Sequence, residues 1–242
     1  MTGTTAKSRS LWLVAAAYAV AIAAAGGWLM RGPSTGRLWL DSLVADLLAT
    51  VVVFGFSRAY RNSSVYDAYW SVIPPLLTCY WWARGGLGVE QLRCWLVTVL
   101  VVVWSVRLTG NWVYGFAGLH HEDWRYALFR ERAGRWEFVV DLVAIHLVPT
   151  AQVFLGMLPV YVCMTHPGRG VSWLAGLALF GVAAAPGQAW WLFVGAVAML
   201  AMFLGASIPM MEQRSLQRRP GYQSVIARVP RFVPRPPRRT AA

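Results

Sequence analysis

The residues best suited to chemistry lie in one polar stretch, 111–126, which reads Asn-Trp-Val-Tyr-Gly-Phe-Ala-Gly-Leu-His-His-Glu-Asp-Trp-Arg-Tyr. Its imidazoles, carboxylates, aromatic rings and Arg125 form a mixture that can hold a phosphorylated cofactor. Residues 120–123 look like metal ligands, but four consecutive side chains cannot all converge on one ion, so no metal site is predicted. Glu122 and Asp123 also suit the start of a short interfacial helix that continues through Arg132, because acidic residues favour helix N-termini. A plain exposed loop is the alternative.

Ionisable residues inside apolar stretches are a second group of candidates, because charge within lipid is costly and usually functional. Asp41 and Asp46 lie five residues apart, about 140° around a helix, so they do not share a face and make a poor carboxylate pair. We expect them to cap helices or to form hydrogen bonds between helices. Asp141 and His146 lie in a later apolar stretch. His146 is expected to donate either to a bound carbonyl group or to a backbone oxygen.

The C-terminal tail, 212–242, carries eight of the 22 basic residues. Such a tail can adhere to anionic lipid, at about 1 kcal/mol per charge near the surface. Alternatively, Arg214, Arg218 and Arg219 clamp phosphate groups, which arginine binds through two parallel hydrogen bonds. Glu212 stands beside these arginines and is expected to pair with one of them.

These candidates belong to a strongly apolar chain, in which 57% of the 242 residues are hydrophobic and 13% are charged. A soluble domain needs more polar surface, so an integral membrane protein is predicted. The net charge of +12 comes from loops and the tail, and no nucleic-acid-binding motif is visible. The first apolar stretch is too long for a signal peptide and should be retained. Six helical spans are predicted: 11–30, 38–56, 69–83, 92–110, 138–163 and 188–211.

The distribution of basic residues decides the number of crossings. A seventh apolar stretch, 171–185, fits either a short span or a re-entrant segment. If it does not cross, 17 of the 22 Lys and Arg lie inside and 5 outside, whereas seven crossings give 13 and 9. The positive-inside rule favours the first arrangement. We therefore predict an all-α polytopic bundle, 1–211, with six spans, a re-entrant or tilted segment at 171–185, a basic tail, 212–242, and both termini in the cytoplasm.

Four sequence runs are distinctive in combination: Asn62-Ser-Ser-Val-Tyr-Asp-Ala-Tyr-Trp-Ser71, Arg107-Leu-Thr-Gly-Asn-Trp112, His120-His-Glu-Asp-Trp-Arg-Tyr126, and Met211-Glu-Gln-Arg214 with Arg219-Pro-Gly-Tyr222. Together they resemble a membrane family of unknown function from the bacterial cytoplasmic membrane. That family is grouped with the steroid 5-alpha-reductases and, more distantly, with the isoprenylcysteine carboxyl methyltransferases. The resemblance covers roughly residues 40–240.

The resemblance implies a helical bundle that binds NADPH at its cytoplasmic end and reduces an alkene conjugated with a carbonyl. The partners implied are membrane lipid and a hydrophobic, lipid-like substrate. It implies catalytic roles for Asp67, Tyr69, Asn111 and Glu122. It implies cofactor binding by Asp123, Arg125, Tyr126, Glu212, Arg214, Arg219 and Tyr222.

One departure from the family pattern concerns the cofactor site. Family members carry an Arg-His-Pro-Asn-Tyr-x-Gly-Glu run before the last span, and this run contributes much of that site. Here residues 171–176 lead directly into residues 177–184, and the run is absent. Two alternatives to the reductase therefore stay open. One is a shortened member without catalysis, which serves as a membrane scaffold or binds lipid or nucleotide, and the other is a methyltransferase that uses S-adenosylmethionine.

Overall fold

The computed structural model describes residues 2–85, 89, 91–166, 194–219 and 221–228. Its contacts divide the chain into two compact units, 1–195 and 196–242. Every regular element in the described residues is helical, which confirms the all-α prediction. The predicted re-entrant segment, 171–185, and the start of the predicted last span lie outside the described residues.

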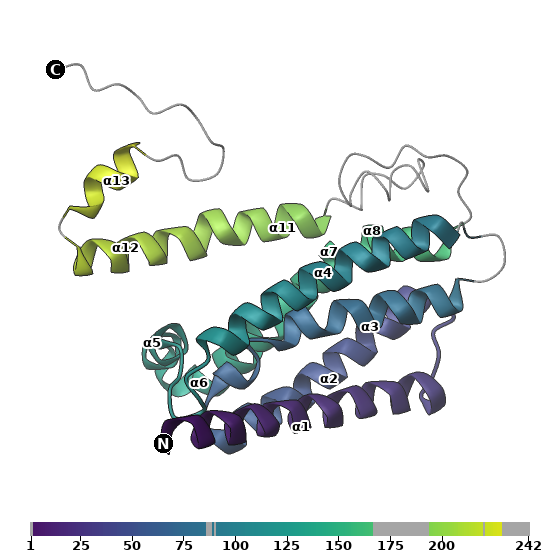
Figure 1. Ribbon diagram of the computed structural model, residues 1–242, viewed down its shortest axis with the longest axis horizontal. Helices are drawn as coiled ribbons and strands as arrows, with labels where there is room; N and C mark the ends of the chain where they lie inside the picture. Colours follow the sequence, from purple (N-terminus) through teal and green to yellow (C-terminus); the bar gives the residue numbers. More distant parts are fainter. Residues whose placement is uncertain (1, 86–88, 90, 167–193, 220, 229–242) are drawn as a thin grey trace. The chain divides into compact units, whose positions relative to one another are not determined.

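The first unit is a bundle built on four helices, α1 (Thr2–Arg31), α2 (Leu38–Tyr60), α3 (Tyr69–Arg84) and α4 (Gln91–Gly115). Figure 1 shows α1 to α4 running lengthwise, with α5 (Trp124–Ala133) and α6 (Glu137–Val140) at the end where the chain begins. Lys7 donates to the carbonyl oxygen of Tyr114 at 3.1 Å, which joins the start of α1 to the end of α4. Residues 7, 58–67 and 114–141 thus gather at one end of the bundle.

The predicted fifth span, 138–163, is a series of helical pieces and not one regular helix. After α6 come a π-helical turn, η3 (Asp141–Leu147), then α7 (Val148–Gly156) and α8 (Leu158–Thr165). The helix is interrupted at Met157, between α7 and α8, because Pro159 lacks the backbone N–H that would donate to the carbonyl oxygen of Leu155. A 3₁₀ turn, η2 (Gly134–Trp136), joins α5 to α6.

Local sequence explains where the polar ends of the helices form. Asp41 accepts hydrogen bonds from Ser34 and Thr35, which fixes the loop before α2. Asp123 accepts from the backbone N–H of Arg125 and caps α5, as predicted. Asn62 caps the short 3₁₀ turn η1 (Ser63–Val65) by accepting from the N–H of Ser64.

Four helical segments among the described residues are long and apolar enough to cross a membrane: Ala6–Arg31, Leu38–Tyr60, Gln91–Gly115 and Trp124–Gly156. They support the prediction of a membrane protein. The 16 residues of α3 extend about 24 Å, less than the hydrocarbon thickness of about 30 Å. The count of six crossings and the orientation of the termini therefore stay predictions.

The second unit, described by itself, consists of most of α11 (Val194–Met202), a π-helical turn η5 (Phe203–Ser207), α12 (Ile208–Arg218) and α13 (Tyr222–Arg228). The predicted boundary between bundle and tail, 211/212, falls inside α12. That boundary stays a prediction.

Candidate functional site

An ion-pair cluster ties α2 to the α6–η3 segment. Arg58, in the last turn of α2, donates from Nη2 to Oε1 of Glu137 at 2.9 Å and from Nη1 to Oδ2 of Asp141 at 3.2 Å. Asp141 is only 1% exposed, so its charge needs these donors. Arg58 thus links α2 to the α6–η3 segment, about 80 positions later in the sequence.

Arg130 and Glu122 extend this cluster to α5. Arg130 pairs with Glu122 and donates from Nη1 to Oγ of Ser63 at 3.2 Å. Ser63 donates from its hydroxyl group to Oδ1 of Asp141 at 2.7 Å, and its backbone N–H donates to Oε1 of Glu122 at 2.7 Å. Glu122, implied as catalytic by the resemblance, therefore links Ser63 to Arg130 of α5 through hydrogen bonds.

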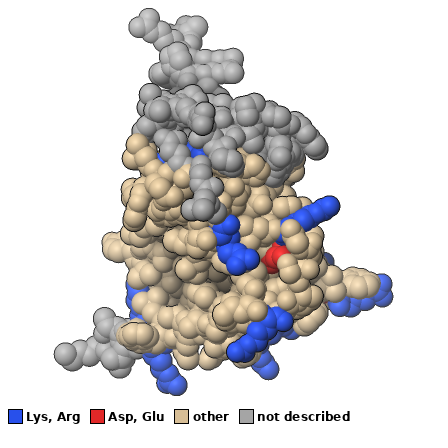
Figure 2. All heavy atoms as spheres, turned by 90° about the vertical axis from the view of Figure 1, so that its right-hand side faces the viewer, with Lys and Arg blue, Asp and Glu red and all other residues tan. Residues whose placement is uncertain are grey.

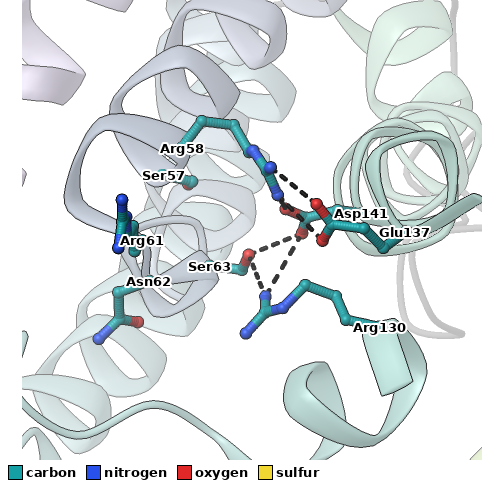
Figure 3. A pocket seen from close by; sticks show the side chains of 8 residues that line it. All are labelled: Ser57, Arg58, Arg61, Asn62, Ser63, Arg130, Glu137 and Asp141. Carbon is teal, nitrogen blue, oxygen red and sulfur yellow. Dashed lines mark hydrogen bonds and ion pairs between the residues drawn. The ribbon is translucent and has the colours of Figure 1, made fainter. Parts of the chain in front are cut away.

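A cavity of about 420 Å³ lies beside the cluster. Figure 3 shows Arg58 facing Glu137 and Asp141 on one side, with Arg61 on the opposite side. The lining of the cavity is polar and includes three basic and two acidic side chains. The lining residues are Ser57, Arg58, Arg61, Asn62, Ser63, Arg130, Glu137 and Asp141.

A second polar group joins four residues that the resemblance implied. Arg125 donates from Nε and Nη2 to the two carboxylate oxygens of Asp123, each at 2.9 Å. Tyr126 donates its hydroxyl proton to Asp67, and the backbone N–H of Asp123 donates to Oγ of Ser64 at 3.1 Å. Burial raises the pKa of the Asp67 carboxyl group from 3.8 to about 6, although the hydrogen bond from Tyr126 opposes this rise.

Inside the bundle, Tyr69 donates to Oδ1 of Asp46 at 3.0 Å. Tyr69 is 1% exposed and Asp46 is 5% exposed. No ion pair with Asp46 is formed by the described residues. This hydrogen bond between α2 and α3 confirms the role predicted for Asp46.

Further hydroxyl groups inside the bundle also form hydrogen bonds with one another. The hydroxyl group of Thr150 lies 2.8 Å from that of Tyr66 and 2.9 Å from that of Thr50. His146 Nδ1 lies 2.8 Å from the backbone oxygen of Asp141, and its Nε2 lies 3.1 Å from Oγ of Ser57. The backbone alternative predicted for His146 is therefore the one observed.

Asn111 is not part of these groups. Asn111 is exposed on α4, and no side-chain hydrogen bond is described for it within the part of the chain that the structure covers. Glu212 and Arg214 lie on α12, Arg219 follows that helix, and Tyr222 begins α13. These four belong to the second unit, so their part in a shared site stays a prediction.

The sequence did not predict most of the residues that line the cavity. Arg58, Ser63, Arg130 and Glu137 were not among the predicted site residues, and Asp141 was considered only together with His146. The sequence feature that could have identified Asp141 is its position as an acidic residue within an apolar stretch, but Asp46 shares this feature. Among the described residues, no three His, Cys, Asp or Glu side chains form a group able to hold a metal ion.

Comparison with known proteins gives a family but no activity. A family model described as "Protein of unknown function (DUF1295)" matches residues 53–179. The match includes the first three distinctive runs and not the fourth, residues 211–222. No curated protein and no solved structure matches the chain. Because the match covers more than half of its length, the chain belongs to the DUF1295 family of proteins of unknown function.

Proposed function

We propose that this protein is a membrane-embedded, NADPH-dependent reductase of the CH–CH type that acts on a hydrophobic enone-type lipid. The observation that carries the proposal is the hydrogen bond between Tyr69 and Asp46 inside the bundle. In this proposal the O–H group of Tyr69 turns from Asp46 to a substrate carbonyl oxygen and polarises it. The resemblance to the steroid 5-alpha-reductases supports the same reaction.

When bound, NADPH would supply the hydride for the carbon β to the carbonyl, and a proton from solvent would complete the saturated product. Tyr69 polarises the carbonyl oxygen, and Asp46 holds the phenol in place. The residues at the bundle end that suit the phosphates of the cofactor are the arginines of the cavity, Arg58, Arg61 and Arg130. The tail residues Glu212, Arg214, Arg219 and Tyr222 are proposed to complete the site.

A second candidate function is that of a shortened, non-catalytic member that binds lipid or nucleotide. It is favoured by the hydrogen bonds of Asp123, Arg125 and Tyr126, which are directed to one another and to Asp67. The absence of the Arg-His-Pro-Asn-Tyr run from the sequence also favours it. Methyl transfer from S-adenosylmethionine is the remaining alternative.

The test uses the purified full chain in phosphatidylcholine nanodiscs. NADPH binding is followed by quenching of tryptophan fluorescence, and turnover of cholest-4-en-3-one by loss of NADPH absorbance. We expect Tyr69→Phe to slow reduction about 100-fold while NADPH affinity is unchanged, because only the general acid is removed. Tyr161→Phe, a half-buried tyrosine without a described side-chain hydrogen bond, is the control.

The other outcomes separate the candidates. If the protein binds neither NADPH nor S-adenosylmethionine, the non-catalytic candidate is favoured and the reductase is rejected. Saturable binding of S-adenosylmethionine alone would favour the methyltransferase. Equal rates for wild type and Tyr69→Phe would remove Tyr69 from the mechanism.

A further inference from the structure

Arg61 has an unusual backbone conformation. It follows α2 with φ 51° and ψ 39°, in the left-handed region, and its N–H bonds the carbonyl oxygens of Ser57 and Arg58. Helices commonly end in this way, but usually with glycine, because a Cβ in this conformation crowds the backbone. Among the described residues, Arg61 is the one non-glycine residue with positive φ. Non-glycine residues held in this conformation are often found at functional sites.

The guanidinium of Arg61 lines the cavity and is exposed. In contrast to Arg58 and Arg130, it has no hydrogen bond or ion pair with the described residues. Figure 3 shows it across the cavity from Glu137 and Asp141. Arg61 is therefore the basic group of the cavity whose guanidinium donors are available to bind a ligand.

The other polar groups of the lining are already engaged. Asn62 donates to the carbonyl oxygens of Leu119 and His121 and accepts from Ser64. Glu137 and Asp141 are paired with Arg58, and Asp141 also lies 3.9 Å from Arg130. Arg130 is paired with Glu122, so among the three arginines of the cavity only the charge of Arg61 lacks a carboxylate partner in the described residues. This unpaired charge favours an anion beside Arg61.

We propose that this cavity binds a phosphate group through Arg61. The planar guanidinium matches two phosphate oxygens through paired hydrogen bonds, and the volume of about 420 Å³ admits such a group. A nucleotide and a phospholipid headgroup carry the same chemistry. If the ligand is NADPH, this proposal rests on the proposed function and adds to it a contact for one of the cofactor's phosphates.

The nucleotide test uses adenosine 2′,5′-bisphosphate, which has the phosphates without the nicotinamide. Isothermal titration of the full chain in phosphatidylcholine nanodiscs, in phosphate-free buffer, should give binding that Arg61→Ala weakens at least 10-fold. Arg132→Ala should bind as wild type does. Arg132 is an exposed arginine of α5 that does not line the cavity, so it controls for the loss of one positive charge.

The lipid test uses nanodiscs that contain phosphatidylglycerol. Native mass spectrometry should then show retained phosphatidylglycerol on wild type and Arg132→Ala and its loss on Arg61→Ala. If Arg61→Ala loses the bisphosphate or the phosphatidylglycerol, the proposal is supported, and the ligand that is lost identifies the source of the phosphate. The proposal is overturned if Arg61→Ala behaves as wild type in both tests, or if wild type retains neither ligand.

Arg61→Gly separates binding from a structural role. Glycine relieves the left-handed conformation, so the melting temperature should rise by about 2–4 °C while phosphate binding is lost. A purely structural arginine would lower the melting temperature when replaced. If the bisphosphate binds but NADPH is never oxidised, the phosphate site stands and the reductase is rejected. If NADPH is oxidised and Arg61→Ala changes neither binding test, the reductase stands and this site is rejected.

Discussion

Tyr126 and Asp67 illustrate how one hydrogen bond tunes a carboxyl group. Burial favours the neutral form of Asp67, whereas the hydroxyl group of Tyr126 donates to the ionised form and favours that form. Asp123 raises the pKa of Asp67 and Arg125 lowers it, so these two charges oppose each other. The balance leaves the pKa at about 6, within the range where a carboxyl group exchanges protons near neutral pH.

We predict that Tyr126→Phe raises the pKa of Asp67 above about 6, because it removes a donor that stabilises the carboxylate. The protonated C=O band of Asp67 in infrared titrations, assigned by its loss in Asp67→Asn, measures this shift. The folded state binds more protons than the unfolded state between about pH 4 and 6. The stabilising contribution of this group therefore falls as pH rises through that window, and Tyr126→Phe should extend the window upward. An unchanged or lower pKa would contradict the assignment.

Single residues also show what the sequence could predict about the site. Asp123 was identified as a helix cap because capping depends on residues two or three positions away. Arg58 could not be paired in advance with Glu137 or Asp141, because no local pattern relates residues about 80 positions apart. Asn111 was implied by a motif, yet its side chain is exposed on α4.

At the scale of elements, the π-helical turn η3 explains how Asp141 and His146 meet. In an α-helix, residues five apart point about 140° away from each other. The i→i+5 pattern of a π-helix instead brings residue i+5 over residue i, and His146 Nδ1 lies 2.8 Å from the backbone oxygen of Asp141. Asp141, the first residue of this turn, accepts from Arg58. The sequence predicted helix here but not the irregular turn, because such turns have no strong local signal.

The contact between the end of α3 and α8 depends on Gly85. A Cβ at Gly85 would lie 2.0 Å from the carbonyl oxygen of Met164, although its φ of −69° suits any residue. We predict that Gly85→Ala lowers the unfolding free energy by about 1–3 kcal/mol, since the two helices must separate. Reversible denaturation in detergent measures the change.

Gly55→Ala is the matched control for this prediction. A Cβ at Gly55, within α2, meets no atom within 4 Å. Alanine is the better helix former, so this variant should be stabilised by up to about 1 kcal/mol. Equal effects of the two substitutions would show that helix propensity, and not close packing, controls the response at Gly85.

For the whole molecule, the distribution of basic residues along the sequence predicts which end of the first unit faces the cytoplasm. Lys7, Arg58, Arg61 and Arg130 gather at the end of the bundle that holds the cavity, whereas Arg93 donates to the carbonyl oxygen of His166 at the other end. The face in Figure 2, which looks onto that other end, is mostly uncharged, and its basic side chains stand apart. The orientation in the membrane can be predicted in this way because it depends on which loops carry basic residues and not on specific contacts, and it stays a prediction.

This sorting predicts that the cavity end faces the cytoplasm and that both termini share that compartment. In a chain with Cys79, Cys94 and Cys163 replaced by alanine, a membrane-impermeant maleimide should label Pro33→Cys in intact bacterial cells and Ser8→Cys only after lysis. A fluorescent protein fused after Ala242 should mature, whereas alkaline phosphatase fused there should be inactive. Labelling of Ser8→Cys in intact cells would reverse the orientation. An active phosphatase fusion combined with a protected Ser8→Cys would require an odd number of crossings, so that 171–185 would have to span the membrane.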